Sequence, residues 1–571
     1  MHRPILFFVA ALFLARSAQP ATPAEDFQRL EDRFFTEAYF RFHPTAGTSD
    51  GFHQYDTQLE DFSETERREE AAVLRRYLSE FEKMDASRLP PQTAADRELV
   101  IAHIRATLLD LEQIRSWEKN PDLYSGGVTA SIFTIMSRTY APPAERLKSV
   151  IARERMIPRV FDEARANLKN PPRIYTTVAL EQLPGLLSFF RKDVPAAFRA
   201  VHDAALLAEF QASNQRVLAA LESYRDFLKN DLLPRSHGDF RIGTENYRRK
   251  LAYEEMVDTP LDRLLAVGFE DLRRNQRQFR EVAARIDAKR SPQQILEDLE
   301  KEHPAPEKLL DTFRGVLGGL RQFIEERGII TIPWQVMPIV EETPPFMRAL
   351  TFASMDTPGP YEKSAKEAFF NITLPEAGWS ATQISEHMAA FNRGTVISTA
   401  IHEAYPGHYV QFQWIQQAPS KTRKLLAANS NAEGWAHYCE QMMLDEGYQR
   451  NDLGLRLGQL QDALLRDARY IVGIEMHTGK MSFEQGIEFF RKEGYQTGAV
   501  AERETKRGTS DPTYLVYTLG KLQILKLRQD YRQMRGGRFR LREFHDRFML
   551  EGAPPIKIIR RALLGNDTPV L

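Results

Sequence analysis

His402, Glu403 and His408 lie close together in a segment whose pattern predicts a helix. A His followed by Glu, with a second His nearby, is similar to the zinc-peptidase pattern H-E-x-x-H. In that pattern two imidazoles one helical turn apart bind the metal, and the Glu is a general base towards metal-bound water. Here the second His is six positions on, about 240° around a regular helix. The segment therefore predicts a metal site only if the helix is broken between the two histidines.

Pro406 and Gly407 lie between the histidines and could supply that break. Proline removes an intrahelical hydrogen bond and clashes with the preceding turn, while glycine can adopt backbone dihedral angles that are sterically disfavoured for other residues. Together they could end the helix and turn His408 back towards His402. The alternative is a helix terminus that carries two histidines and binds no metal.

A second segment starts at Asn429 with residues typical of a helix N-terminus and continues as a helix. Glu433, His437 and Glu440 share one face of this helix, at positions i, i+4 and i+7. The separation from His402 suits a zinc site whose third ligand is a Glu on a following helix. An isolated triplet of this kind is usually a solvated polar face, but beside the histidine pair the metal interpretation is favoured.

A third segment contains Asp511 and Pro512, which predict the start of another helix. Tyr517 lies on this helix, and a phenol near a polarised carbonyl can donate a hydrogen bond to the developing oxyanion. Ordinary amphipathic packing is the alternative for this tyrosine. His477 is open to two similar interpretations, as a donor near the site or as a hydrogen-bonded structural histidine.

The rest of the chain must hold these segments in place, and its pattern predicts a mainly α-helical protein. Residues 24–326 have apolar positions at three- and four-residue spacing, and the same pattern returns from residue 380 to about residue 561. Between these parts the chain is rich in β-branched and aromatic residues, which predicts a small sheet of three or four strands. The candidate strands are 329–332, 336–340, 350–354 and 369–374.

Composition limits the possible functions. The 571 residues are 42% hydrophobic, enough for a large core in two to four lobes or one helical body with a deep cleft. Lys and Arg number 77 against 78 Asp and Glu, so we expect no nucleic-acid partner. The single cysteine, Cys439, excludes an intramolecular disulfide and a Cys-rich metal site. Any metal must be held by His and carboxylate side chains.

Residues 1–18 are typical of a secretory signal peptide, with a positive start, a short apolar run and small residues before the cleavage site. No Cys follows it, so we expect no lipoprotein anchor, and no later segment is apolar enough to span a membrane. The prediction is export to the periplasm or the medium without a membrane span after cleavage. An uncleaved N-terminal helix is the alternative.

Taken together, the segment 402–408, the segment 433–436 and the segment 512–520 resemble the signature blocks of the bacterial DUF885 family. That family is regarded as related to zinc carboxypeptidases and oligopeptidases of the zincin type. The resemblance covers one unit over residues 24–571, comprising a helical N-terminal part, 24–326, and a catalytic part, 327–571. It implies a zincin-like helical body around a deep channel, with a small sheet beside the metal helix.

The resemblance also implies His402, His408 and Glu433 as ligands of one Zn²⁺ and Glu403 as general base. Tyr517 and His477 are candidate catalytic donors. Candidate substrate contacts are Arg507, Asn371 and His437, with an edge strand near residues 370–372 holding the peptide backbone.

These observations predict an exported zinc-dependent peptidase whose partner is a peptide substrate. A narrow channel favours short peptides or chain ends, as in a carboxypeptidase or an oligopeptidase. One alternative is a metallohydrolase of non-peptide amides or esters, and another is a non-catalytic exported peptide-binding protein. The sequence makes no prediction of oligomeric state.

Overall fold

The computed structural model describes residues 22–348 and 351–571, and the predicted signal peptide lies outside this part of the chain. The protein is mainly α-helical. In the first part of the chain, the helices of eight or more residues are α1 (Pro23–Phe34), α4 (Glu64–Lys83), α5 (Pro91–Leu109), α7 (Asp122–Met136), α8 (Pro143–Asn167), α9 (Arg173–Ser188), α11 (Ala204–Phe227), α12 (Thr244–Glu254), α13 (Leu261–Ile286), α14 (Pro292–Leu299) and α15 (Leu309–Arg327). The second part contains α16 (Ala381–Ala389), α17 (Arg393–Glu403), α18 (His408–Ile415), α20 (Asn429–Asp445), α21 (Leu453–His477), α22 (Phe483–Lys492), α23 (Gly498–Ser510), α24 (Val516–Arg535), α25 (Leu541–Leu550) and α26 (Ile556–Leu564).

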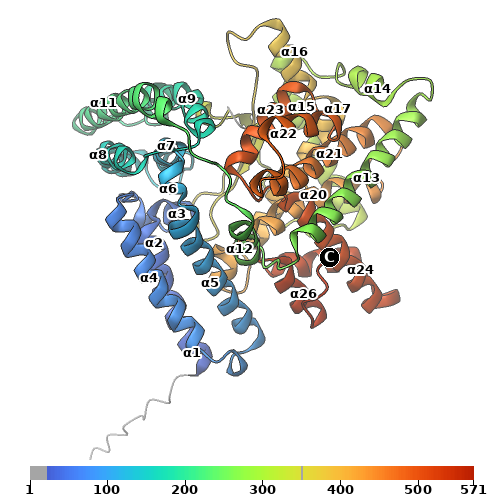
Figure 1. Cartoon of the computed structure of the whole chain (residues 1–571), viewed down its shortest axis with the longest axis horizontal. Coiled ribbons are helices and arrows are strands. Elements are labelled where there is room, and N and C mark those ends of the chain that lie inside the picture. Colours follow the sequence, from blue (N-terminus) through green and yellow to red (C-terminus); the bar gives the residue numbers. More distant parts are fainter. Residues whose placement is uncertain (1–21, 349–350) are drawn as a thin grey trace, which may run out of the picture.

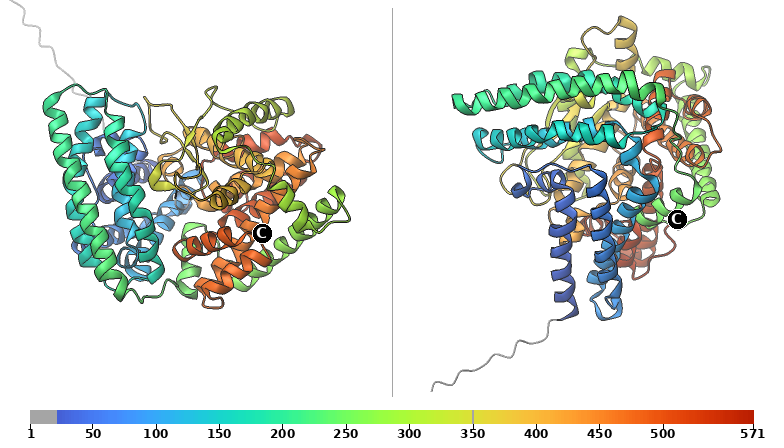
Figure 2. Two further views of the ribbon diagram at one scale, coloured as in Figure 1. Left: turned by 90° about the horizontal axis from the view of Figure 1, so that it is seen from above. Right: turned by 60° about the vertical axis from the view of Figure 1, so that its left-hand side comes forward.

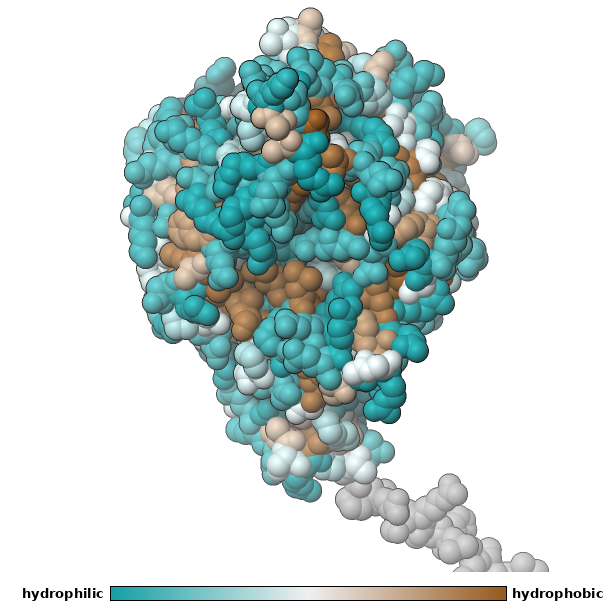
Figure 3. All heavy atoms as spheres, turned by 90° about the vertical axis from the view of Figure 1, so that its right-hand side faces the viewer, coloured by the Kyte–Doolittle hydropathy of each residue, from teal (hydrophilic) through white to brown (hydrophobic). Residues whose placement is uncertain are grey.

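The two sides of the molecule are formed by different stretches of the chain, and the division falls after α11, so that α13 to α15 lie with the helices of the second part. Helices α1 to α11, coloured blue to green, form one side, and α13 to α26 gather on the other (Figures 1 and 2). The periodic segments of the sequence are confirmed as helices, and α8 and α13 are two long examples. Within the described ranges, no helix is both long and apolar enough to cross a membrane. The face in Figure 3 is mostly hydrophilic, with hydrophobic side chains gathered across its middle.

Helix α13 packs along α21 although nearly 200 residues separate them in sequence. Buried Leu264 and Leu272 belong to the same hydrophobic cluster as Leu464 and Ile471. The helices are close because Gly268 faces the ring of Tyr470, where a Cβ atom would lie 2.5 Å from the ring. The helices before residue 326 therefore help to hold α21, which contributes side chains to the candidate site.

The small sheet has the three strands β1 (Ile339–Glu342), β2 (Ala353–Asp356) and β3 (Phe369–Ile372), in the order β1-β3-β2. Strand β1 is parallel to β3, with Ile339 opposite Phe369, and β2 is antiparallel to β3, with Ala353 opposite Ile372. Strand β3 is therefore central. The predicted edge strand near residues 370–372 is wrong, because both of its sides are already paired.

The prediction of a strand at residues 329–332 is also wrong. Its isoleucines are buried in the large core, which explains the β-like pattern of the sequence. The backbone carbonyls of Ile329 and Thr331, however, make hydrogen bonds with side chains and not with a neighbouring strand. The carbonyl of Ile329 lies 2.8 Å from Nδ1 of His545, and the carbonyl of Thr331 accepts a hydrogen bond from the indole of Trp414.

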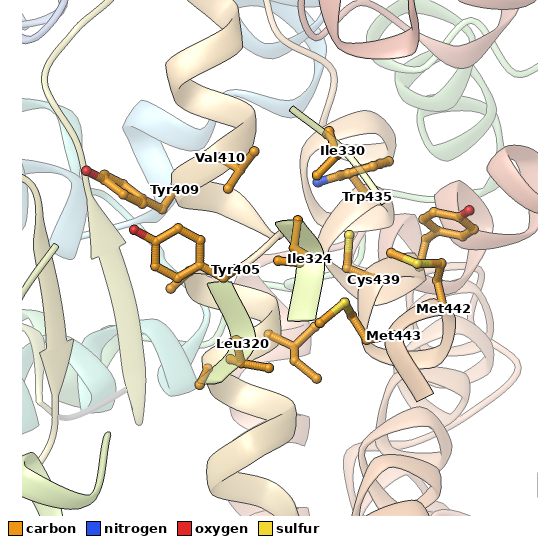
Figure 4. Packing of buried hydrophobic residues seen from close by; sticks show 14 of the residues in the cluster. Leu320, Ile324, Ile330, Tyr405, Tyr409, Val410, Trp435, Cys439, Met442 and Met443 are labelled. Carbon is orange, nitrogen blue, oxygen red and sulfur yellow. The ribbon is translucent and has the colours of Figure 1, made fainter. Parts of the chain in front are cut away.

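The core behind the candidate site is filled by aromatic and sulfur-containing side chains (Figure 4). Tyr405 comes from the segment between α17 and α18 and Tyr409 from the first turn of α18, while Trp435 and Cys439 come from α20. Cys439 is fully buried, and burial raises the pKa of its thiol, so it is a packing residue without nucleophilic character.

Helices α20 and α24 touch through glycines. A Cβ atom on Gly520 would lie 1.8 Å from the carbonyl oxygen of Ser430, and one on Gly434 would lie 2.5 Å from the Cα atom of Gly520. Neither position can accept a side chain unless the helices separate. This contact fixes the distance between the helix that carries Glu433 and the helix that carries Tyr517.

We expect Gly520→Ala to lower the stability of the protein by about 1–3 kcal/mol, because the added methyl group overpacks a backbone contact. Gly127→Ala in α7 is the matched control, since nothing lies within 4 Å of its Cβ position. That change should be neutral or stabilise by up to about 1 kcal/mol through helix propensity. Thermal unfolding of both variants measures the difference, and equal midpoints would contradict the close helix contact.

Candidate metal centre

The helix is broken between the two histidines, as the sequence requires for a metal site. Helix α17 ends at Glu403 and α18 begins at His408, with a cis peptide bond between Tyr405 and Pro406. The amide of Gly407 donates to the carbonyl of Ile401 at 3.0 Å, which folds the chain back on the end of α17.

Glycine is required at position 407. A Cβ atom there would lie 1.7 Å from the carbonyl oxygen of His402 and 2.4 Å from that of Ile401. The turn is also held from α20, because the indole of Trp435 donates to the carbonyl of Pro406 at 2.9 Å. The prediction that this segment ends the helix and turns His408 back is therefore confirmed.

His402, His408 and Glu433 converge from α17, α18 and α20. One possible ligand atom from each lies within 4.8 Å of the others. The Nε2 atoms of both histidines are each 3.3 Å from Oε2 of Glu433, and their rings are nearly perpendicular, with centroids 4.9 Å apart. Both imidazoles are largely buried.

This donor set fits zinc. Two imidazole nitrogens and one carboxylate oxygen are the ligands that catalytic zinc sites use, with a further position left for water. Oε2 of Glu433 is buried and makes no hydrogen bond with any residue in the described ranges. A cation between the three ligand atoms would satisfy that oxygen.

Glu440 fixes the orientation of His402. Its Oε1 atom lies 2.7 Å from Nδ1 of His402 and 2.9 Å from the guanidinium of Arg466, and its Oε2 atom lies 3.1 Å from Nδ1 of His437. Burial alone would raise the pKa of this carboxyl, but the charge of Arg466 and its hydrogen bonds lower it below its usual range. An ionised Glu440 holds the proton of His402 on Nδ1 and directs Nε2 to the cluster.

His437 lies behind Glu440 and is fully buried. Burial lowers the pKa of its imidazole to about 3, so the ring is neutral at ordinary pH. Such burial does not fit the substrate contact that we predicted for His437. The structure instead shows a residue that helps to orient Glu440.

Tyr517 lies beside the cluster on α24. Its ring is stacked near that of His402, with centroids 6.3 Å apart, and its hydroxyl accepts a hydrogen bond from Arg507 at 2.9 Å. Burial, together with the charge of Glu433, raises the pKa of the phenol, so it is protonated at neutral pH and can donate to an oxygen at the site. The predicted helix start at Asp511 and Pro512 is wrong, because these residues form the turn before α24.

His477 and Asn371 are not among the residues that converge at the cluster. Nε2 of His477 lies 2.7 Å from the carbonyl of Gly508, and burial lowers the pKa of this histidine to about 4. Of the two interpretations of His477, the structure supports a structural histidine, because its ring is fully buried and hydrogen-bonded to the backbone. Asn371 lies buried on the central strand with its amide 3.4 Å from the hydroxyl of Ser354, so the substrate contact predicted for it on an edge strand is not available.

Glu403 follows His402 at the end of α17 and is 9% exposed. In the part of the chain that the structure describes, its carboxylate has no hydrogen bond or ion pair with another side chain. Its carboxylate is therefore not committed to another described side chain.

Sequence reasoning did not assign Glu440 and Arg466 to the site. Glu440 could have been found, because it shares a helix face with Glu433 and His437 and a ligating histidine needs a partner for its second nitrogen. Arg466 is 64 positions from His402. Its role depends on the packing of α21 against α20, which no local pattern encodes.

We expect the purified protein to bind about one zinc ion per chain, measured by elemental analysis after dialysis. His408→Ala should lose this zinc, and Glu440→Gln should weaken zinc binding by about 10- to 100-fold, since it removes the charged partner of His402. The control is His237→Ala, at an exposed histidine, which should bind zinc as the wild type does. Zinc retained in full by His408→Ala would exclude the proposed ligand set.

Comparison with known proteins agrees with this architecture. No curated protein matches the chain. The structure is similar to a "putative lipoprotein of unknown function" from Shewanella oneidensis, with a TM-score of 0.76, 26% identity and coverage of 94% of this chain and 99% of that one. It shares its fold with a "putative lipoprotein" from Colwellia psychrerythraea, with a TM-score of 0.74, 18% identity and coverage of 95% and 98%. The model of the bacterial family of unknown function DUF885 matches residues 44–563, and the chain belongs to that family.

Proposed function

We propose that the protein is an exported zinc-dependent peptidase that hydrolyses short peptides or chain ends. The observation that carries this proposal is the convergence of His402, His408 and Glu433 within 4.8 Å, with Glu403 directly after the first ligand. Ligands from three helices meet only because the chain turns sharply at Gly407. Position 407 has no room for a side chain, and this requirement supports a role for the cluster beyond packing.

Zinc held by these residues would activate a water molecule and polarise the scissile carbonyl. Glu403 has the position of a general base, because it is adjacent to His402 and its carboxylate has no ion pair within the described residues. It would accept the proton of the attacking water and later transfer it to the leaving amine.

Tyr517 would donate a hydrogen bond to the oxygen that becomes negatively charged during the attack. Arg507 donates to the phenol oxygen and so directs the phenol proton away from itself. The guanidinium carbons of Arg469 and Arg466 lie 4.9 and 5.8 Å from the ring of Tyr517. These guanidiniums are themselves paired with Glu504 and Glu440, so the hydrogen bond of the phenol, more than their charge, would stabilise negative charge on a substrate oxygen.

Two other functions use the same geometry. A metallohydrolase of non-peptide amides or esters would share the metal chemistry and differ only in substrate. A non-catalytic peptide-binding protein would not need a carboxylate directly after the first proposed ligand, so Glu403 favours catalysis. The predicted signal peptide supports export to the periplasm or the medium, and the descriptions of the two similar structures as lipoproteins support a place in the cell envelope.

We expect Glu403→Gln to lower peptide hydrolysis by about 10²- to 10⁴-fold, because the amide cannot accept the proton of water. Zinc content should be unchanged, since this side chain is not a ligand in the proposed site. Turnover of a peptide panel and of matched ester and amide substrates by zinc-loaded protein provides the test. A fully active Glu403→Gln protein would refute the mechanism, and activity on esters alone would favour the second function.

We expect Tyr517→Phe to lower kcat by about 10²- to 10³-fold with little change in KM, because the phenol bonds an oxygen whose charge develops in the transition state. Tyr495→Phe, at a partly exposed tyrosine on the loop after α22, is the matched control. An unchanged kcat in Tyr517→Phe would assign this tyrosine to packing.

A further inference from the structure

Helix α23 presents two arginines one turn apart. Arg503 and Arg507 are at positions i and i+4, so they project from the same side of the helix. Arg507 reaches the hydroxyl of Tyr517, which lies beside His402. This side of α23 therefore borders the candidate active site.

The three arginines over the ring of Tyr517 are each paired with a carboxylate, whereas Arg503, one helical turn from Arg507, is not. Arg466 pairs with Glu440 at 2.9 Å, Arg469 with Glu504 at 2.6 Å, and Arg507 with Asp511 at 3.2 Å. Among the residues that the structure describes, no carboxylate oxygen lies within 4.0 Å of the Arg503 guanidinium, and the remaining residues, 1–21 and 349–350, include no Asp or Glu in the sequence.

Arg503 is nevertheless partly buried, and burial lowers its pKa. Burial also lowers the pKa of Arg146 and Arg153, but those guanidiniums donate to backbone carbonyl oxygens. A cation that is withdrawn from water without a negative partner is unfavourable. A negatively charged ligand at this place would supply the missing partner.

Arg503 is also held in an orientation that suits an anion. Its guanidinium carbon lies 4.3 Å from the centroid of the Phe352 ring, and that ring is stacked on His387. A guanidinium over an aromatic face is restrained there, and among the described residues the N–H groups of Arg503 have no hydrogen-bond partner. The planar fork of a guanidinium matches the two oxygens of a carboxylate.

We propose that Arg503 binds a carboxylate of the substrate and that Arg507 supports it, so that the preferred substrates are peptides with a free carboxylate close to the scissile bond. This inference rests on the proposed peptidase function. An extended peptide advances about 3.5 Å per residue, and one helical turn separates Arg503 from the arginine that contacts Tyr517. A C-terminal carboxylate held by Arg503 would therefore place the scissile bond a few residues or fewer from the chain end.

The test compares three peptides that differ only in their carboxylates. They are Ala-Ala-Phe as the free acid, Ala-Ala-Phe as the C-terminal amide, and Ala-Glu-Phe as the C-terminal amide. Turnover is measured with the zinc-loaded wild type, and binding is measured by calorimetry with zinc-loaded Glu403→Gln, which does not consume the peptide. We expect the free acid to bind about 10- to 100-fold more tightly than the Ala-Ala-Phe amide.

Arg503→Gln should reduce the ratio of the affinities for the free acid and the Ala-Ala-Phe amide to about 1. Arg503→Lys should keep part of this preference, because a point charge replaces the planar fork. The control is Lys506→Gln, which removes the same charge from α23 at a lysine that pairs with Glu181 and Glu502. It should keep the full preference. A merely structural role of Arg503 would weaken acid and amide equally and leave their ratio unchanged, which would overturn the inference.

The outcomes separate this inference from the peptidase proposal. Hydrolysis without a preference for the acid would keep the peptidase and refute the carboxylate site, and this comparison needs no variant at position 503. Preferential binding of the acid without hydrolysis would keep the carboxylate site and refute the peptidase. If the free acid and the glutamyl amide both bind more tightly than the Ala-Ala-Phe amide, to the same extent, Arg503 recognises side-chain and C-terminal carboxylates alike. If only the free acid binds more tightly, Arg503 recognises the chain end. Binding of none of the three peptides would refute both proposals.

Discussion

The close approach of Gly407 to the last turn of α17 is the constraint on which the candidate site depends. With hydrogen as its side chain, this residue lets the chain fold over the carbonyl of His402 and start a new helix at once. His408 then faces His402 although six positions separate them. Any larger residue would push the two helices apart, and Glu433 would have a single histidine beside it.

A layer of buried charge supports this turn. Glu440 lies between His402, His437 and Arg466, so a single carboxylate links α17, α20 and α21. Such groups are costly to bury, and they persist only where hydrogen bonds satisfy them. Their effect is to fix which nitrogen of His402 faces the cluster. The glycine contact between α20 and α24 then sets the place of Tyr517 relative to the same ligands.

Much of this arrangement could be predicted from the sequence, because it is encoded locally. Helical periodicity predicts α8 and α13, and the Pro-Gly pair predicts the break before His408. Residues 329–332 were mistaken for a strand because burial alone produces the same run of isoleucines. The order of the strands, and hence the central place of Asn371, follows from long-range pairing that no single segment specifies. The burial of His477 and the part played by Arg466 likewise depend on which helices pack together.

We propose that His402, His408 and Glu433 hold a catalytic zinc ion. X-ray absorption spectroscopy of the zinc-loaded protein tests this most directly, because it reports the identity and distance of the ligands. We expect two imidazole nitrogens and oxygen ligands at about 2.0–2.2 Å, with one oxygen from water. A spectrum with a sulfur ligand, with a single imidazole, or with the six oxygens of hydrated zinc would contradict it.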